Sequence, residues 1–389
     1  MNRGPVLAIM SLAHFLVMVD ATIVNVALPS VQSGLGLDAG GLTWVVNAYS
    51  FAFGGFLLVG GWAADRLGPA RVFVAGMAVF AAGSVICGMA ATAEVLVAGR
   101  VVQGVGGAFV CPAALAAITV AFPGPGERAR ALAGWSAAGA AALALGPVVG
   151  GLLTAAWSWP AVFLVPVPLC LLAVVAARRW LPRVLSRVLS PRRSLAGFPY
   201  RRVATANVVL ALASAAMVVT CYTCTLWLQD ALGYGPVVTG LTFLPLSLGI
   251  LAGAAAAPHV LRRAGPVPVA VLGLGVAAMG LVLLVALPTE VTPWQLLPAL
   301  TVLAVGFGLQ SVPVCALATT VPGDQGVAAA VYQTAGQLGG AMGLVALSGV
   351  VSEVDMWRGW AFAGGAAALV AAALLGSRAR ERMAVSVRD

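Results

Sequence analysis

Apolar stretches of about 20 residues recur along the whole chain, and this recurrence constrains the fold more than any other feature of the sequence. A helix needs about 20 apolar residues to cross the hydrocarbon core of a bilayer. Only 8% of the 389 residues are charged and 61% are hydrophobic, whereas soluble domains carry about 25% charged residues. So little charge cannot cover that much apolar surface in water. The sequence therefore predicts an all-α membrane protein.

Twelve membrane-spanning helices are predicted from these stretches. We expect the first to be retained rather than cleaved as a signal peptide, because it contains His14 and Asp20 and continues to Pro29. Glycine and proline recur inside the stretches, as membrane helices tolerate. The predicted spans are 6–28, 42–62, 72–92, 95–119, 131–153, 158–177, 203–227, 237–260, 267–287, 295–318, 326–350 and 357–376.

The placement of arginine predicts the orientation in the membrane. All 21 basic residues are arginine, and they lie mainly in short runs between apolar segments. With the amino terminus inside, nineteen of them face the cytoplasm, and Arg358 is the one arginine in a proposed outer loop. The proposed cytoplasmic loop around Asp324 carries none. We therefore expect a multi-pass protein of the bacterial cell (inner) membrane with both termini in the cytoplasm, and no nucleic-acid partner despite the net charge of +9.

Several classes of function are excluded or disfavoured by residues that the sequence lacks. A Walker A loop needs a lysine to reach the phosphates, and the absence of lysine excludes an ATP-hydrolysing site in this chain. Cys221 and Cys224 have C-x-x-C spacing, but no second pair or histidine cluster accompanies them, so packing in the membrane is favoured over a metal or redox site. His14 and His259 are far apart, and no nucleophile–base cluster is visible. We expect no enzyme activity, no metal and no cofactor.

The chain divides into two similar halves. Residues 61–69 resemble residues 258–266 at an offset of 197, which indicates two six-helix bundles related by a parallel repeat. Between them, the short segment Val184–Ser190 fits either an interfacial helix on anionic headgroups or a flexible linker. The predicted parts are an N-terminal six-helix bundle (1–177), a cytoplasmic arginine-rich linker (178–202), a C-terminal six-helix bundle (203–377) and a cytoplasmic tail (378–389).

Six short motifs appear in order along the chain. They are Asp20–Pro29, Gly61–Arg71, Arg100–Gly107, Gly146–Gly151, Leu228–Tyr234 and Gly336–Gly340. Together they resemble the drug:proton antiporters of the major facilitator superfamily, especially a branch usually built with fourteen helices. The sequence departs from that branch at Pro69 and Ala70, where basic residues are usual, and at residues 178–202, which hold no room for two extra helices. The resemblance thus implies a twelve-helix relative with the major facilitator fold.

Asp20 and Arg100 are the candidate proton-coupling residues. Charge near the middle of the bilayer costs several kcal/mol unless it is paired or hydrated, so such residues are functional candidates. At about 1.5 Å per residue, Asp20 lies roughly 21 Å from the inner end of its helix and Arg100 roughly 8 Å from the outer end of its own. In a core about 30 Å thick they reach a similar depth. A neighbouring arginine favours an ionised carboxylate and burial favours the protonated form, so a change in their separation would capture or release a proton. The alternative is an ion pair that only fixes helix packing.

Two further groups are assigned roles from the resemblance. A conformational latch at a cytoplasmic helix end comprises Gly61, Asp65, Arg66, Gly68 and Arg71; ordinary positive-inside charge is the alternative for Arg66. An antiporter hinge, whose small residues would let helices of the two halves approach closely, comprises Ala142, Gly146, Pro147, Gly150 and Gly151.

Polar and aromatic residues inside the spans are candidates for a substrate cavity that takes a bulky amphiphilic or cationic solute. Trp227 alternatively belongs to an interfacial aromatic belt. The candidates are Asn25, Asn47, Tyr49, Gln103, Tyr222, Trp227, Gln229, Gln310, Tyr332, Gln333 and Gln337.

The predicted function is proton-coupled secondary antiport that exports a hydrophobic or cationic small molecule, such as an antibiotic. The alternatives are a proton-coupled metabolite transporter on the same fold and a non-transporting membrane receptor. The expected partners are the small-molecule substrate, protons and the lipid bilayer, and the proton gradient would drive transport without a cofactor. We expect a monomer.

Overall fold

A computed structural model describes residues 3–185, 200–288, 290–319, 325–348 and 354–385. This part of the chain is almost entirely helical and contains no β-strand. It forms two compact units, Met1–Ala196 and Gly197–Asp389, each of which is described below by itself.

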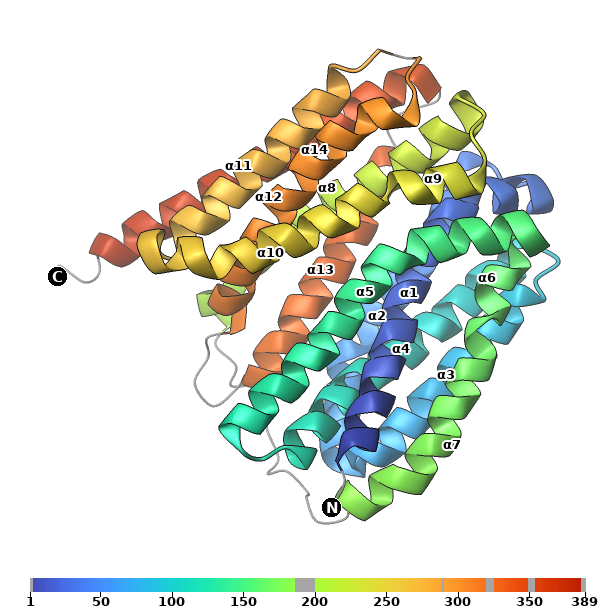
Figure 1. The fold of residues 1–389 in the computed structure, drawn as a ribbon, viewed down its shortest axis with the longest axis vertical. Coiled ribbons are helices and arrows are strands. Elements are labelled where there is room, and N and C mark those ends of the chain that lie inside the picture. The colour runs from blue at the N-terminus through green and yellow to red at the C-terminus, as the bar shows by residue number, and fades with distance from the viewer. Residues whose placement is uncertain (1–2, 186–199, 289, 320–324, 349–353, 386–389) are drawn as a thin grey trace. The chain divides into compact units, whose positions relative to one another are not determined.

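The amino-terminal unit is a bundle of long helices in which α1 packs against α5, α4 and α7, and α3 packs against α4 and α7 (Figure 1). Its helices are α1 (Gly4–Leu35), α2 (Ala39–Leu67), α3 (Pro69–Gly88), α4 (Ala93–Ala121), α5 (Pro125–Trp157), α6 (Pro160–Leu164) and α7 (Pro166–Leu185).

The carboxy-terminal unit repeats this arrangement of contacts, because α8 packs against α13 and α12 packs against both α10 and α11. Its helices are α8 (Tyr200–Leu226), the π-helix η2 (Trp227–Ala231), α9 (Pro236–Thr242), α10 (Leu244–Ala264), α11 (Pro266–Val285), α12 (Pro293–Thr319), α13 (Gln325–Ser348) and α14 (Val354–Val385).

Each of the twelve predicted spans coincides with one helix or with two consecutive helices. The span predicted at 158–177 is broken at Val165, before the proline that begins α7, and the span at 237–260 is broken at Phe243. Within the described residues, nine helical segments are long and apolar enough to cross a membrane, and shorter apolar segments lie at Leu145–Trp157 and Ala361–Leu375. The chain is thus a multi-pass membrane protein by the length and composition of its helices.

Two predicted boundaries differ from the helices observed. Helix α7 continues through residues 178–185, which had been assigned to the linker, and α14 continues into the predicted tail as far as Val385. The rest of the proposed interfacial segment, the loop at Asp324 and Glu353 lie outside the described residues. Both helices extend past their apolar stretches because arginine and alanine are good helix formers. Hydropathy alone does not predict these extensions.

One turn is repeated in both units and explains a glycine in each. Gly68 ends α2 and precedes α3 with φ of 88°, and Gly265, at the offset of 197, ends α10 and precedes α11 with φ of 79°. Side chains with a Cβ atom rarely adopt such positive φ values. A proline directly after each glycine begins the next helix, where its missing N–H is harmless.

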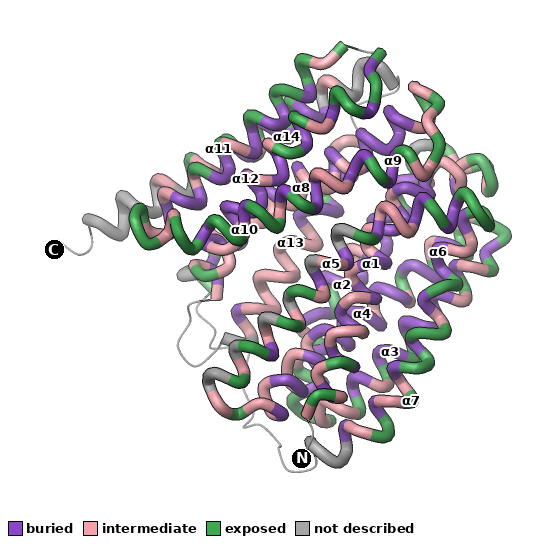
Figure 2. The backbone as a smooth tube through the Cα atoms, in the orientation of Figure 1, coloured by how far each residue is buried: buried purple, intermediate pink, exposed green. Residues whose placement is uncertain are grey.

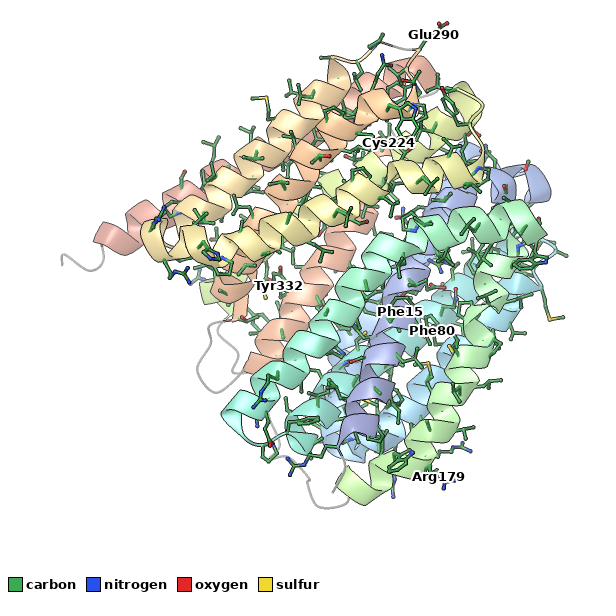
Figure 3. All side chains as sticks on the ribbon, viewed as in Figure 1. Phe15, Phe80, Arg179, Cys224, Glu290 and Tyr332 are labelled. Carbon is green, nitrogen blue, oxygen red and sulfur yellow. The ribbon has the colours of Figure 1, made fainter. Side chains whose placement is uncertain are left out.

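Glycines also set the distance between helices in corresponding places of the two units. In the first unit, a methyl group added at Gly106 would lie 2.7 Å from Cα of Phe80, the buried α3 residue labelled in Figure 3. In the second, a methyl group at Gly306 would lie 2.7 Å from Cα of Ala277. Backbone contact between helices is a recognised way to gain packing in a membrane, where the hydrophobic effect offers little.

Burial follows this packing. Helix α1 has buried residues along most of its length, from Val6 to Val31 (Figure 2). By contrast α7 exposes Leu171, Leu172 and Val175, as expected of a helix that faces lipid.

Replacing Gly106 with alanine is expected to lower stability by about 1–3 kcal/mol, because the new methyl group meets backbone atoms that cannot rotate away. Thermal unfolding of purified protein in detergent measures this. The matched control is Gly275→Ala, since nothing lies within 4 Å of the methyl group it adds. Equal melting temperatures for the two variants would contradict the packing argument.

Candidate functional site

The first unit contains a fully buried ion pair between α1 and α4. Nη1 of Arg100 donates to Oδ2 of Asp20 at 2.6 Å, and the two side chains are 1% and 0% exposed. Eighty residues separate them in the chain, so the contact depends on α1 and α4 packing against each other. The structure thus brings together the two residues predicted to couple protons.

Gln103 connects both members of this pair. Its Nε2 donates to Oδ1 of Asp20 at 2.8 Å and to the hydroxyl of Ser84 on α3 at 2.8 Å. Its Oε1 accepts from Arg100 Nη1 at 3.0 Å. One amide therefore fixes the carboxylate and the guanidinium at once, and we call Asp20, Ser84, Arg100 and Gln103 the charge cluster.

The guanidinium of Arg100 has further partners from other helices. Its Nε donates to the carbonyl oxygen of Val45 on α2 at 3.0 Å. Its Cζ lies 4.4 Å from the ring centre of Tyr49 and 5.8 Å from that of Phe163. Aromatic faces attract a cation, and the attraction grows when water is excluded. These contacts offset part of the cost of burying the charge.

The local sequence explains how α3 approaches the cluster. A methyl group at Gly83 would lie 2.6 Å from the backbone nitrogen of Gln103 and 2.8 Å from its Cγ. Any side chain at this position would separate α3 from α4 and pull Ser84 away from Gln103. Gly83 therefore belongs to the construction of the site although it has no polar group.

Sequence reasoning had assigned Gln103 and Tyr49 to a substrate cavity, whereas the structure places both against Arg100. It had not singled out Ser84, Val45 or Phe163. The spacing from Arg100 to Gln103 places both on one helix face and could have indicated the link to Asp20. Nothing in the sequence pairs Ser84 with α4.

The second unit holds apolar residues at the corresponding places. Gly280 corresponds to Gly83 and faces Leu303 as Gly83 faces Gln103. On this helix the offset is 200, as Gln103 and Leu303 show, so Arg100 corresponds to Leu300, one helical turn before Leu303; both leucines are fully buried. At the offset of 197, Asp20 corresponds to Met217 and Ser84 to Leu281. The repeat thus conserves the glycine contact between two helices and replaces every member of the charge cluster.

The remaining cavity candidates are spread over both units. Asn47 and Gln310 are buried, and an amide oxygen of each has no hydrogen-bond partner in the described residues. Tyr222 and Trp227 are also buried, Trp227 as the first residue of the π-helix η2. Partly buried candidates are Asn25, Gln229, Tyr332, Gln333 and Gln337.

Among the described residues, no three histidine, cysteine, aspartate or glutamate side chains gather as ligands for a metal ion.

The latch candidates cluster at the junction of α2 and α3. Asp65, Arg66 and Arg71 are exposed in this structure. The guanidinium of Arg66 lies 4.9 Å from the ring centre of Trp62. Gly68 supplies the positive φ of the turn and Gly61 faces α4, so both glycines have a local structural role.

The hinge candidates face α1 within their own unit. A methyl group at Gly146 would collide with the hydroxyl of Thr22, and one at Gly150 would collide with the carbonyl of Ile23. Ala142, Gly150 and Gly151 are buried and Pro147 is partly buried. The contacts observed for this stripe thus lie next to Asp20, whereas a contact with the other half had been predicted.

Replacing Gln103 with leucine, the residue at the corresponding place of the second unit, is expected to lower stability by about 1–3 kcal/mol. The change removes the amide group that donates hydrogen bonds to Oδ1 of Asp20 and to the hydroxyl oxygen of Ser84. Thermal unfolding measures the loss against Gln310→Leu, a buried glutamine whose Oε1 is already unpaired. A smaller loss for Gln103→Leu than for Gln310→Leu would show that the network does not stabilise the bundle.

Comparison with known proteins identifies the family of the chain. The chain is 33% identical to the puromycin resistance protein pur8 of Streptomyces alboniger, over 88% of this chain and 81% of that protein. It is 31% identical to the cephamycin export protein CmcT of Amycolatopsis lactamdurans, over 93% and 90%. A crystal structure of a D-xylose–proton symporter has the same fold, with a TM-score of 0.78 over 97% of both chains at 15% identity. The sequence profile of the Major Facilitator Superfamily matches residues 10–344, and the chain belongs to that superfamily.

Proposed function

We propose that this protein is a proton-coupled antiporter that exports a hydrophobic or cationic small molecule, of the kind represented by antibiotics, across the bacterial cell membrane. The observation that carries the proposal is the buried charge cluster, in which Asp20 is fully enclosed and paired with Arg100. A carboxylate at this depth of a membrane helix is costly to keep and is typical of proton pathways.

The contacts of Arg100 explain how a proton on Asp20 would change the preferred conformation. With Asp20 ionised, the cation has a counter-charge at 2.6 Å. Protonation of Asp20 removes that charge and leaves a buried cation with only a carbonyl, an amide and two aromatic faces. Leaving one partner of a buried pair uncompensated costs about 3–5 kcal/mol. A conformation in which water reaches Arg100 is then favoured over the one in which Arg100 is buried without a counter-charge. Proton binding to Asp20 is thereby linked to a conformational change of the protein.

The energy available is of the same order as this cost. One proton moving down a potential of 100 mV supplies about 2.3 kcal/mol, and a pH difference adds to it. Coupling through a single carboxylate therefore requires no nucleotide and no cofactor.

The direction and the substrate class rest on the relatives. Two of them, aligned over most of their length, are named for resistance to puromycin and for export of cephamycin. We assign export on this ground, with a monomer as the working unit and both termini in the cytoplasm as the arginine placement predicts. Protons, the transported compound and the bilayer are the partners, and nucleic acid is not.

Everted membrane vesicles test the proposal, because their interior corresponds to the outside of the cell. Vesicles with an acidic interior are expected to accumulate at least one of puromycin, a cephamycin and a cationic dye, and to lose it when a protonophore collapses the gradient. Asp20→Asn is expected to reduce accumulation to the level of vesicles without the protein, since an amide cannot exchange a proton. Membrane content is measured by immunoblot.

Glu290→Gln is the matched control, because it removes an exposed carboxylate from a loop of the other unit. It is expected to transport as the wild type does. Undiminished accumulation by Asp20→Asn would remove Asp20 from the coupling step, and no gradient-driven accumulation of any compound by the wild type would refute proton-driven export.

A further inference from the structure

A second ionisable residue of α1 lies buried outside the charge cluster. Helix α1 carries two ionisable side chains, Asp20 and His14. The imidazole of His14 is 8% exposed and stacks on the indole of Trp135 from α5, with ring centres 3.8 Å apart and planes inclined by 19°. Gly139, one turn further along α5, has no side chain, and a methyl group there would collide with Nε2 of His14. Figure 3 labels the neighbouring residue Phe15 on α1.

This aromatic pair is unusual because both of its rings carry a buried polar atom without a partner. Neither Nδ1 of His14 nor Nε1 of Trp135 has a hydrogen-bond partner among the described residues. A buried polar group without a partner costs about 1–3 kcal/mol, so each such group needs an explanation. A water molecule between α1 and α5 would satisfy both atoms, since Nδ1 of a neutral imidazole can accept and the indole N–H can only donate.

Packing alone does not require a histidine at this place. The second unit has the same close approach between the corresponding helices, with Gly339 facing Ala211 as Gly139 faces His14. His14 and Ala211 stand at the offset of 197 that relates Gly68 to Gly265. The unit with the charge cluster therefore also has the histidine, and the unit without the cluster has a methyl group instead.

The position of His14 along α1 fits a path to the cytoplasm. It lies six residues, or about 9 Å, before Asp20 on the side of the amino terminus. The other charged groups on the helices that contact α1 lie at helix ends or in the charge cluster, and the remaining titratable groups are one phenol and two thiols inside these helices. The titratable groups are Tyr49, Asp65 and Arg66 on α2; Glu94, Arg100 and Cys111 on α4; Glu127, Arg128 and Arg130 on α5; and Cys170, Arg178, Arg179 and Arg183 on α7, while α6 has none. Glu127 pairs with Arg3 at the start of α1, at 2.9 Å.

We propose that His14 receives the proton that Asp20 releases and passes it to the cytoplasm. The inference rests on the proposed antiport. The O–H bond of the Asp20 carboxyl breaks, and its proton moves through water to the lone pair on Nδ1 of His14. This step leaves a carboxylate paired with Arg100 and an imidazolium stacked on Trp135, where the electron-rich indole face stabilises the cation. The imidazolium then loses the proton to cytoplasmic water and returns to the neutral ring.

Nuclear magnetic resonance of the histidine ring tests the exchange without any transported compound. His259 is the other histidine of the chain and is exposed on α10, so His259→Gln leaves His14 as the sole histidine. In ¹⁵N-histidine-labelled protein of this variant, the ring of His14 is expected to gain a proton as the pH is lowered. Adding Asp20→Asn is expected to move the midpoint to lower pH, because the carboxylate that favours the imidazolium is gone. A ring that stays neutral down to pH 5, or a midpoint unaffected by Asp20→Asn, would overturn the proposal.

Transport assays of the His14→Phe variant distinguish a role of His14 in proton release from a role in packing. Phenylalanine keeps a flat ring against Trp135 but cannot carry a proton. In everted vesicles with an acidic interior, the rate of puromycin uptake is expected to fall by about a hundredfold or more, since a proton-transferring group typically contributes about 10²–10⁴-fold. Exchange of labelled for unlabelled puromycin without a gradient, which needs no proton release, is expected to persist. Equal losses in both assays would indicate a structural role and contradict the proposal.

His259→Gln is the control and is expected to retain gradient-driven uptake. These experiments distinguish a failure of the proposed proton-driven export from a failure of the proposed proton transfer through His14. If the wild type shows no gradient-driven uptake, proton-driven export fails, while the resonance experiment still decides whether His14 exchanges protons in the presence of Asp20.

Discussion

The ion pair between Asp20 and Arg100 is the constraint on which the rest of the first unit depends. Two opposite charges with almost no exposure to solvent are tolerable only if the surrounding helices supply polar partners. Helix α2 supplies the Val45 carbonyl and α4 the Gln103 amide, and the Ser84 hydroxyl of α3 in turn accepts from Gln103. The close approach of α3 and α4 is thus a requirement of the electrostatics as well as a feature of the packing.

The two units show which parts of the repeat concern the fold and which concern the chemistry. Both keep a glycine of positive φ between the second and third long helices and a glycine contact between the third and fourth. Only the first has charge at the sites next to that contact, because the second has buried leucines there. The second unit forms a bundle of the same kind without the charge cluster, so the fold by itself does not require the cluster. Proton exchange is the purpose that our proposal assigns to it.

Much of this arrangement follows from the sequence, for identifiable reasons. Apolar length predicts the helices, and the cost of mid-membrane charge selects Asp20 and Arg100. Spacing along a helix does not reveal what lies on the neighbouring helix, so Ser84 and the stacking of His14 on Trp135 required the structure. Hydropathy also missed the helical continuation of α7 past residue 177, where arginines replace apolar residues but remain good helix formers.

The central claim is that Asp20 binds and releases a proton while it is enclosed by helices. Infrared difference spectroscopy measures this directly, because a protonated carboxyl group absorbs apart from a carboxylate. Between alkaline and acidic samples of purified protein in lipid, we expect a carboxylic acid C=O band that is absent from the Asp20→Asn variant and present in Glu290→Gln. A spectrum of the wild type that is identical to that of Asp20→Asn over the whole pH range would contradict the account.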